Sequence, residues 1–424
     1  MKFIYKLLSL SLAIACLSGC SAANTEIASS SAATATVTPT TDSTEVPASN
    51  NVFTSAGDGL YVTTDSGIYE LQTVFPDSAN IFYTDANTKE RIFLCANPNC
   101  THADESCPSY IATPSAMFPP MLLRVGDQLL VVFTEATDSS NPHGMLMNMD
   151  GSNRRTVFEL ASNQYMQGGF CTSGNDLYFD LYEINDGGNV TYQLWYVSFE
   201  NGTSEKVMDL GSDSDHYSLC DGANNELCFN HVSSDGISYC MYNPQSKTIS
   251  DPFFVDSSVS GNSMIQDGYL FVLDEQASSV QRIRLSDKEQ ASASFTVKEG
   301  FGAPSMRYLF DGNLMITEAQ TTASDIPTDG SYGVCSYILD FGTRNCTEFT
   351  LQTPYNNRPV YVLTTIGDAC YVATDYKTYT PTSVSEDGTV SNFDYVANIY
   401  AFITKQDYIN SNQNGYSMVK DAFE

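Results

Sequence analysis

Three cysteines and one histidine lie within 13 residues of each other, at Cys95, Cys100, His102 and Cys107. Thiolates and an imidazole are the ligands of tetrahedral Cys₃His zinc sites. Pro98 and short polar residues between the ligands let the segment curl around an ion. All four ligand positions would then come from the protein, whereas a catalytic zinc keeps one position open. The spacing therefore predicts a structural zinc site in a loop at 95–107, rather than a catalytic centre.

Two other interpretations of this cluster stay open. A disulfide between two of the three cysteines, with the third free or paired elsewhere, suits an exported protein. A loop of reduced thiols suits a protein from an anaerobe. The other seven cysteines of the mature chain fall in or beside expected strands, where cysteine packs as a small hydrophobic residue. They are Cys171, Cys220, Cys228, Cys240, Cys335, Cys346 and Cys370.

Catalytic motifs are missing from the sequence. It has no Gly-x-Ser-x-Gly elbow, no His-Glu-x-x-His pair, no phosphate loop and no dinucleotide fingerprint. Of the four histidines, only His102 has cysteine neighbours. With 50 acidic residues some carboxylates must lie close together, but no spacing selects an acid/base couple of the glycosidase kind. We therefore assign no catalytic residue from the sequence.

One further cysteine, Cys20, follows an export signal. Lys2 and Lys6 give the positive start, an apolar stretch covers 7–17, and two small residues precede the cysteine. The quartet Leu-Ser-Gly-Cys at 17–20 resembles the bacterial lipobox. That resemblance implies lipidation of the Cys20 sulfur, with acyl chains such as palmitate, and removal of 1–19. We expect a lipoprotein at the extracytoplasmic face of the cell membrane, which it contacts through its lipid only.

The segment at 20–51 carries the lipidated cysteine and a tether. It is rich in Ser, Thr and Ala and lacks aromatic residues. Such a composition cannot bury enough apolar surface to offset the entropy of ordering, so we expect a disordered spacer. A single folded domain is expected to cover 52–424.

The chain is strongly acidic, with a formal net charge of −31. Removal of 1–19 takes away two lysines and no acid, which leaves 17 basic and 50 acidic residues and a net charge of −33. Nucleic acid is excluded as a partner because its binding depends on the neutralisation of phosphates. Anionic lipid surfaces would also repel this domain.

Strand patterns dominate the domain, since short runs of β-branched and aromatic residues alternate with Gly, Asp, Asn and Ser. One phrase recurs: a polar turn, then Leu, then two or three apolar residues. Its leucines lie 48, 50, 43 and 44 residues apart, a period typical of a four-stranded propeller blade; they are Leu129, Leu177, Leu227, Leu270 and Leu314. Weaker copies lie at Leu60 and Cys370. We predict an all-β fold, a β-propeller of seven four-stranded blades, with six or eight as open alternatives.

Two segments resemble known propellers. Ile-Phe-Tyr-Thr-Asp at 81–85 is similar to the Tyr-Trp-Thr-Asp strand of YWTD-like and TolB-like propellers, and the Asp-Gly-Ser-Asn-Arg turn at 150–154 is similar to a turn of the same repeats. The segment Leu-Cys-Ala-Asn-Pro-Asn-Cys-Thr-His-Ala-Asp-Glu-Ser-Cys at 94–107 resembles one in exported propeller lipoproteins of anaerobic gut Firmicutes. These resemblances imply the fold, and in the first family six blades; they imply no activity.

The sequence supports two functional hypotheses. The first is a binding or scaffold module that holds a glycan, peptide or partner protein outside the cell. The alternative is an extracytoplasmic carbohydrate-active propeller enzyme, a glycoside hydrolase or lyase. Two or three inward carboxylates at the separation used by glycosidases, beside an exposed aromatic platform, would favour the enzyme.

Overall fold

A computed structural model describes residues 53–55, 59–75, 78–113, 118–256, 262–320, 333–379, 382–384, 390–392 and 395–422. Cys20, the expected signal peptide at 1–19 and the tether at 20–51 lie outside these residues. The chain divides into the units Met1–Thr44 and Glu45–Glu424, and the description below concerns the second. Within the described residues, no helix has the length and apolar character needed to cross a membrane.

Antiparallel sheets make up nearly all of the described chain, and apart from β1 (Thr54–Ser55), which pairs with a strand at 164–173, each sheet uses strands that are close in sequence. The first contains β2 (Tyr61–Thr63), β3 (Gly67–Phe75), β4 (Ser78–Asp85), β5 (Arg91–Phe93) and β6 (Tyr110–Ala112). The second contains β7 (Met121–Val125), β8 (Gln128–Phe133), β9 (His143–Asn148) and β10 (Arg155–Glu159).

The largest sheet has ten strands and consists of two groups of four with two short additions. One group is β11 (Gln164–Ser173), β12 (Asp176–Ile184), β13 (Val190–Ser198) and β14 (Thr203–Ser212), extended by β1 (Thr54–Ser55). The other is β15 (Asp215–Ala223), β16 (Glu226–Ser233), β17 (Gly236–Asn243) and β18 (Thr248–Ile249), with β19 (Phe254–Asp256) also on β17. Two residue pairs join the groups: Gly211 with His216, and Ser212 with Asp215.

Three further four-stranded sheets follow. They contain β20 (Ser263–Gln266), β21 (Tyr269–Asp274), β22 (Ser279–Arg284) and β23 (Gln290–Ser294); β24 (Phe301–Tyr308), β25 (Leu314–Gln320), β26 (Val334–Asp340) and β27 (Asn345–Phe349); and β28 (Val362–Ile366), β29 (Ala369–Tyr379), β32 (Tyr395–Thr404) and β33 (Ser417–Met418). A hairpin of β30 (Thr382–Val384) and β31 (Val390–Asn392) extends from the last sheet, and α1 (Lys405–Ile409) and a 3₁₀ turn (Gln413–Gly415) precede β33.

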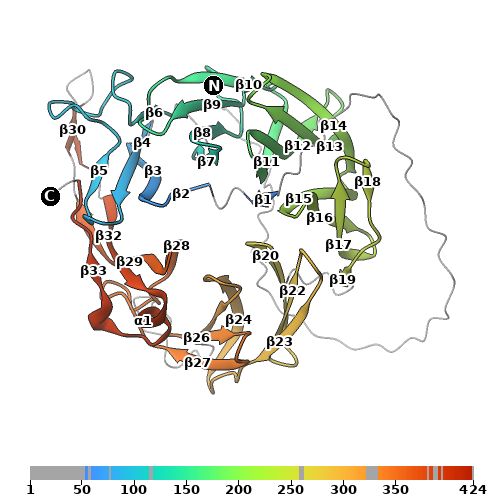
Figure 1. Ribbon diagram of the computed structural model, residues 1–424, viewed down its shortest axis with the longest axis vertical. Coiled ribbons are helices and arrows are strands. Elements are labelled where there is room, and N and C mark those ends of the chain that lie inside the picture. The colour runs from blue at the N-terminus through green and yellow to red at the C-terminus, as the bar shows by residue number, and fades with distance from the viewer. Residues whose placement is uncertain are drawn as a thin grey trace, which may run out of the picture. The chain divides into compact units, whose positions relative to one another are not determined.

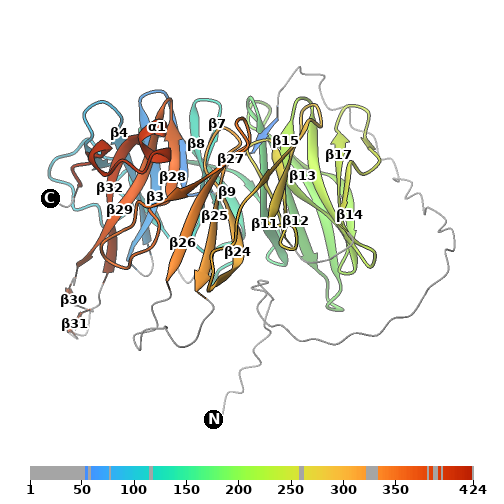
Figure 2. The same ribbon diagram turned by 90° about the horizontal axis from the view of Figure 1, so that it is seen from below.

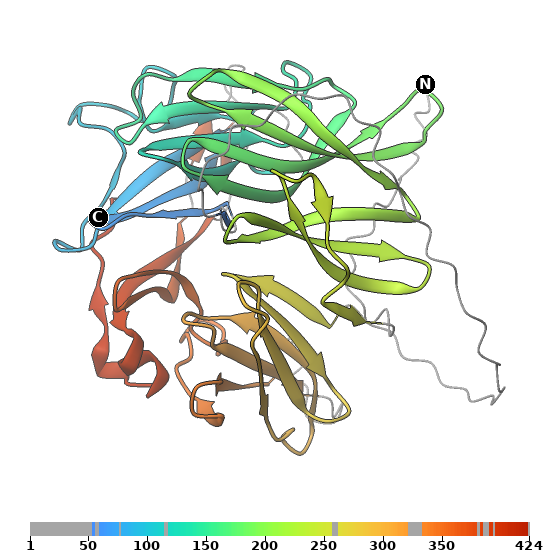
Figure 3. The same ribbon diagram turned by 45° about the vertical axis from the view of Figure 1, so that its right-hand side comes forward.

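The sheets follow one another around a central axis, with β2, β7, β15 and β28 on the inner side (Figure 1). Seen from the side and obliquely, the strands run between the two ends of the ring (Figures 2 and 3). The predicted all-β fold of four-stranded blades is therefore confirmed, and the described chain is a β-propeller. Division at the β14–β15 pairing separates the ten-stranded sheet into two groups of four, β11–β14 and β15–β18, with β1 and β19 as additions. The blade number itself stays a prediction.

Hydrophobic clusters fill the spaces between successive sheets. One brings Leu130 and Leu146 of the second sheet against Phe170 and Phe179 of the group β11–β14. Each blade thus buries both faces against its neighbours, because a single sheet cannot cover its own apolar faces.

The recurring phrase marks the same position in six groups, at the start of the second strand, as in Leu129 of β8 and Cys370 of β29. The copy at Leu60 does not follow this pattern, because it leads into the first strand of its sheet. The equivalent second strand is β3, entered through Ser66 and Gly67. The turn at Leu60 is therefore not equivalent to the other six turns, because it lies one strand earlier in its sheet.

Residues far apart in sequence close the ring. The Arg91 guanidinium is 1% exposed and pairs with Glu70 at 2.9 Å and with Asp421 at 3.3 Å. The Tyr400 hydroxyl donates to the other Glu70 oxygen at 2.6 Å. The last described segment thereby fastens onto the first sheet, beside the Arg91 backbone N–H that donates to the Lys420 carbonyl at 2.9 Å.

Candidate metal centre and binding pocket

The Cys/His loop interrupts the outer strand of the first sheet. Both β5 and β6 pair with β4, at its two halves: Phe82 lies opposite Phe93, and Ser78 lies opposite Ala112. The chain leaves the sheet after β5, forms the loop at 95–107 and returns as β6. The predicted site therefore lies on an edge of the sheet, separated by β3 and β4 from β2 on the inner side.

The structure brings the four predicted ligands together. The Sγ atoms of the three cysteines and a ring nitrogen of His102 all lie within 4.8 Å of one another. The pair His102 Nδ1 and Cys107 Sγ is 3.2 Å apart. Ligand atoms of a tetrahedral zinc with Zn–S bonds of about 2.3 Å are separated by roughly 3.7 Å. The four residues fit a metal after small side-chain adjustments, and they could hold one.

Neighbouring groups fix the orientation of the histidine. Its ring stacks on Phe93 with centroids 4.1 Å apart and planes 8° apart. Its backbone is in the left-handed region, with φ 56°, and its carbonyl accepts from Asn80 Nδ2 at 3.1 Å. The same amide donates to the Ser109 hydroxyl at 3.0 Å, which in turn lies 3.1 Å from Cys107 Sγ. Supporting groups of this kind orient metal ligands.

The thiols of the cluster differ in acidity. Burial raises the pKa of Cys95 to about 11. Burial also opposes ionisation of Cys107, but hydrogen bonds from Ser109 and His102 outweigh it and lower its pKa to about 6. Metal ligation needs thiolates, so metal binding would release protons from the cluster. All three are free thiols in the structure.

The loop is also fastened to the second sheet. Arg154, from the turn between β9 and β10, donates to the Tyr110 carbonyl at 2.6 Å and to the Pro108 carbonyl. A Cβ on Gly151 would collide with that Pro108 oxygen, so the glycine permits the close approach. An ion held by the loop would consequently stabilise the contact between the first two sheets.

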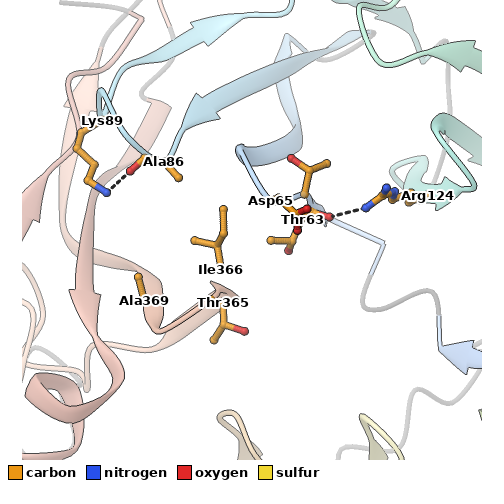
Figure 4. Close-up of a pocket in the computed structure, with 10 residues that line it drawn as sticks. Thr63, Asp65, Ala86, Lys89, Arg124, Thr365, Ile366 and Ala369 are labelled. Atoms are coloured by element: carbon orange, nitrogen blue, oxygen red, sulfur yellow. Dashed lines mark hydrogen bonds between the residues drawn. The ribbon is translucent and has the colours of Figure 1, made fainter.

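A pocket of about 520 Å³ lies where the last sheet meets the first (Figure 4). The lining residues come from four turns: Thr63, Thr64 and Asp65 at the end of β2 and just after it; Ala86 and Lys89 in the β4–β5 turn; Arg124 near the end of β7; and Thr365, Ile366, Gly367 and Ala369 in the β28–β29 hairpin. Neighbouring strands are antiparallel, so turns after first strands and after third strands meet at the same end of a blade. The Thr63 and Thr364 hydroxyls, 3.0 Å apart, join the two sheets there.

The pocket residues were not predicted from the sequence. Gly367 and Ala369 belong to a copy of the recurring phrase, but that phrase marks strand entry and indicates no binding site; the lining comes from four turns that only ring closure brings together. The one available signal was the recurring phrase, because Arg124 and Ile366 stand just before equivalent phrase turns, at 126–127 and 367–368.

A buried carboxylate, Asp180 of β12, lies between the groups β11–β14 and β15–β18. Its Oδ2 accepts from the Leu219 backbone N–H at 3.0 Å, while Oδ1 has no hydrogen-bond partner among the described residues. Gly169 leaves the room for it, because a Cβ there would lie 2.7 Å from Oδ1. Burial raises the pKa of Asp180 to about 7. Its place between two groups of strands suits a structural role.

Comparison with solved structures finds proteins of the propeller type among those similar to this chain. Solved structures similar to this chain include the tricorn protease (11% identity, 81% of this chain and 35% of that chain, TM-score 0.31) and puromycin hydrolase (10%, 81% and 58%, TM-score 0.43). Another is TolB from Acinetobacter baumannii (7%, 84% and 77%, TM-score 0.34). The chain spans less than two thirds of the first two, and at these values no inference about function rests on any of them.

No protein-family model matches the chain. No curated protein matches it either.

Proposed function

We propose that this protein is a lipid-anchored β-propeller on the extracytoplasmic face of the cell membrane, and that it binds a glycan, peptide or protein partner outside the cell. The observation that carries the binding role is the pocket at the junction of the first and last sheets. Its volume of about 520 Å³ falls in the range of about 300–1,000 Å³ typical of ligand sites. Cys20 carries the lipid in this proposal, and the strongly acidic domain leaves nucleic acid out as a partner.

A structural zinc ion belongs to the same proposal. Cys95, Cys100, His102 and Cys107 would hold it, and the protein would supply all four ligands. The ion would stabilise the fold and leave no position for a substrate. The place of the cluster on the sheet edge, away from the pocket residues, supports a structural role.

The pocket gives no support to the alternative of a carbohydrate-active enzyme. Hydrolysis of a glycosidic bond uses a pair of carboxyl groups about 5–10 Å apart. Among the described residues that line the pocket, Asp65 is the one carboxylate. A binding module is therefore the better account of this site.

Binding can be tested by screening the full-length protein, in detergent, on arrays of glycans and peptides. Ala369→Phe should fill the pocket and abolish binding to any ligand that it holds, while Ala369→Ser should leave binding intact. Ligands that bind both variants equally occupy another surface. An array without a single ligand, or with only such ligands, would contradict the proposed role of the pocket.

The anchor has its own test, in a bacterial host that processes lipoproteins. Wild-type chain should incorporate an alkyne-labelled palmitate and sediment with membranes, whereas Cys20→Ala should do neither. Equal membrane association of the two chains, with no label on either, would refute lipidation at Cys20.

A further inference from the structure

The pocket is positively charged on a strongly acidic chain. The sequence has 50 acidic and 19 basic residues. The described lining nevertheless contains two cations, Lys89 and Arg124, against the single carboxylate of Asp65. A local excess of positive charge on an acidic protein is a selective feature, because the surrounding surface repels anions that lack a specific contact.

The two cations differ in how far the protein already uses them. Arg124 donates to the carbonyls of Gly126 at 2.9 Å and Thr63 at 3.4 Å, and it pairs with Asp127 at 3.3 Å. Lys89 donates to the Ala86 carbonyl and is attracted by the nearby Asp85 carboxylate, but it makes no ion pair within 4.0 Å with any described residue. An ammonium has three N–H groups, so Lys89 retains donors for a ligand.

The protein holds the Lys89 ammonium in place. Its backbone is left-handed, with φ 61°, and the backbone N–H donates to the Asp85 carbonyl at 3.0 Å. The ammonium lies 4.0 Å from the centroid of the Phe402 ring. It is partly buried, and this desolvation lowers its pKa. A fixed and partly dehydrated cation gains more from an anion than a mobile surface lysine does.

The other residues that line the pocket indicate the chemistry of the rest of the ligand. Ile366 and Ala369 form an apolar side that faces the polar segment with Thr63 and Asp65 across the pocket (Figure 4). With two cations and one carboxylate, the lining carries a formal charge of +1. We infer that the pocket binds a small organic monoanion through its carboxylate, which lies against the Lys89 ammonium while its body packs on Ile366. This inference rests on the proposed binding role and specifies its ligand class.

A second lysine gives a matched control. Lys288 has φ 62°, donates through Nζ to the carbonyl three residues earlier and lies 4.4 Å from the centroid of Phe253. It repeats the local geometry of Lys89 but is not among the residues that line the pocket. A difference between the two lysines in ligand binding therefore reports the pocket, because the turn geometry is shared.

The experiment is a calorimetric titration of the full-length protein with two pairs of probes. D-glucuronate is compared with D-glucuronamide, and N-acetylalanine with N-acetylalaninamide, so that each pair differs only at the carboxyl group, which is an anion in the acid and a neutral amide in its partner. The first pair represents acidic sugars and the second represents peptide carboxylates. Lys89→Met removes the charge and keeps an unbranched chain over Phe402, and Lys288→Met makes the same change elsewhere.

At least one acid should bind the wild-type protein more tightly than its amide does. Lys89→Met should lower the affinity for that acid about tenfold or more, the loss expected for one charge-assisted hydrogen bond. Lys288→Met should leave this affinity unchanged. Equal affinity of acid and amide, or equal loss in both variants, would overturn the inference. Absence of binding by both acids would also overturn the inference. The proposed binding role would still stand if the arrays give ligands whose binding Ala369→Phe abolishes.

Discussion

If the Cys/His cluster holds zinc, as proposed, free zinc should control the thermal stability of the protein. An ion that binds the folded chain alone stabilises it by RT ln(1 + [Zn]/Kd), about 1.4 kcal/mol for each decade of free zinc above Kd. A folded unit of about 370 residues has an unfolding entropy of about 0.8 kcal/mol/K. Dividing the two gives a rise in Tm of a little under 2 °C per decade.

The assay is differential scanning calorimetry of the full-length protein in zinc buffers that span several decades. Tm should be flat below Kd and then rise with the expected slope, and elemental analysis should give one zinc per chain. Cys100→Ser should lose the slope, because it removes one of four ligands. Cys346→Ser, which changes an exposed cysteine outside the cluster, should keep it.

A wild-type Tm that does not respond to free zinc would refute the metal interpretation. In that event free-thiol counting and mass analysis distinguish a disulfide from a loop of reduced thiols. A disulfide among Cys95, Cys100 and Cys107 removes two thiols and lowers the mass by about two daltons, and reduced cysteines leave both unchanged.

Three further predictions concern stability. The raised pKa of Asp180, about 7, means that the folded state holds this proton more tightly than the unfolded state does. The free energy of unfolding should therefore fall as pH rises from about 4 to about 7, by up to about 4 kcal/mol. Denaturant titrations of Asp180→Asn should show a flatter pH dependence. Glu70→Ala leaves Arg91 buried without its nearest carboxylate and should cost about 3–5 kcal/mol, whereas Glu289→Ala, at an exposed ion pair, should cost under about 1 kcal/mol; equal losses would refute the closing role. Gly211→Ala should lower Tm by several degrees, because φ is +115° and a Cβ would collide with the adjoining hairpin; an unchanged Tm would contradict this.

The fold was predictable because its signal is local and repeated. Leu129, Leu177 and Leu227 follow polar turns at a regular spacing, and the structure places each at the start of a second strand. The copy at Leu60 misled because a turn followed by apolar residues fits a first strand as well as a second. The phrase marks strand entry and contains nothing that fixes which strand is entered.

The two candidate sites differ in whether a local sequence pattern encodes them. The four ligands of the metal site lie within 13 residues of each other, so their spacing alone indicated a shared site. The pocket brings Lys89 near Ile366, and that approach exists only once the first and last sheets meet. No local pattern encodes it. Cys20 and its lipid stay a prediction.

The closing contacts would also set an order of events if the chain is exported, as proposed. Arg91 and Asp421 are separated by 330 positions, yet both belong to one ionic contact in which Arg91 is buried. An exported chain that crosses the membrane with its N-terminal part first would present Arg91 and Glu70 long before Asp421 arrives. The strands of the first sheet would then pair while Arg91 still lacks Asp421, and this side of the sheet would stay uncovered until the last described segment has crossed.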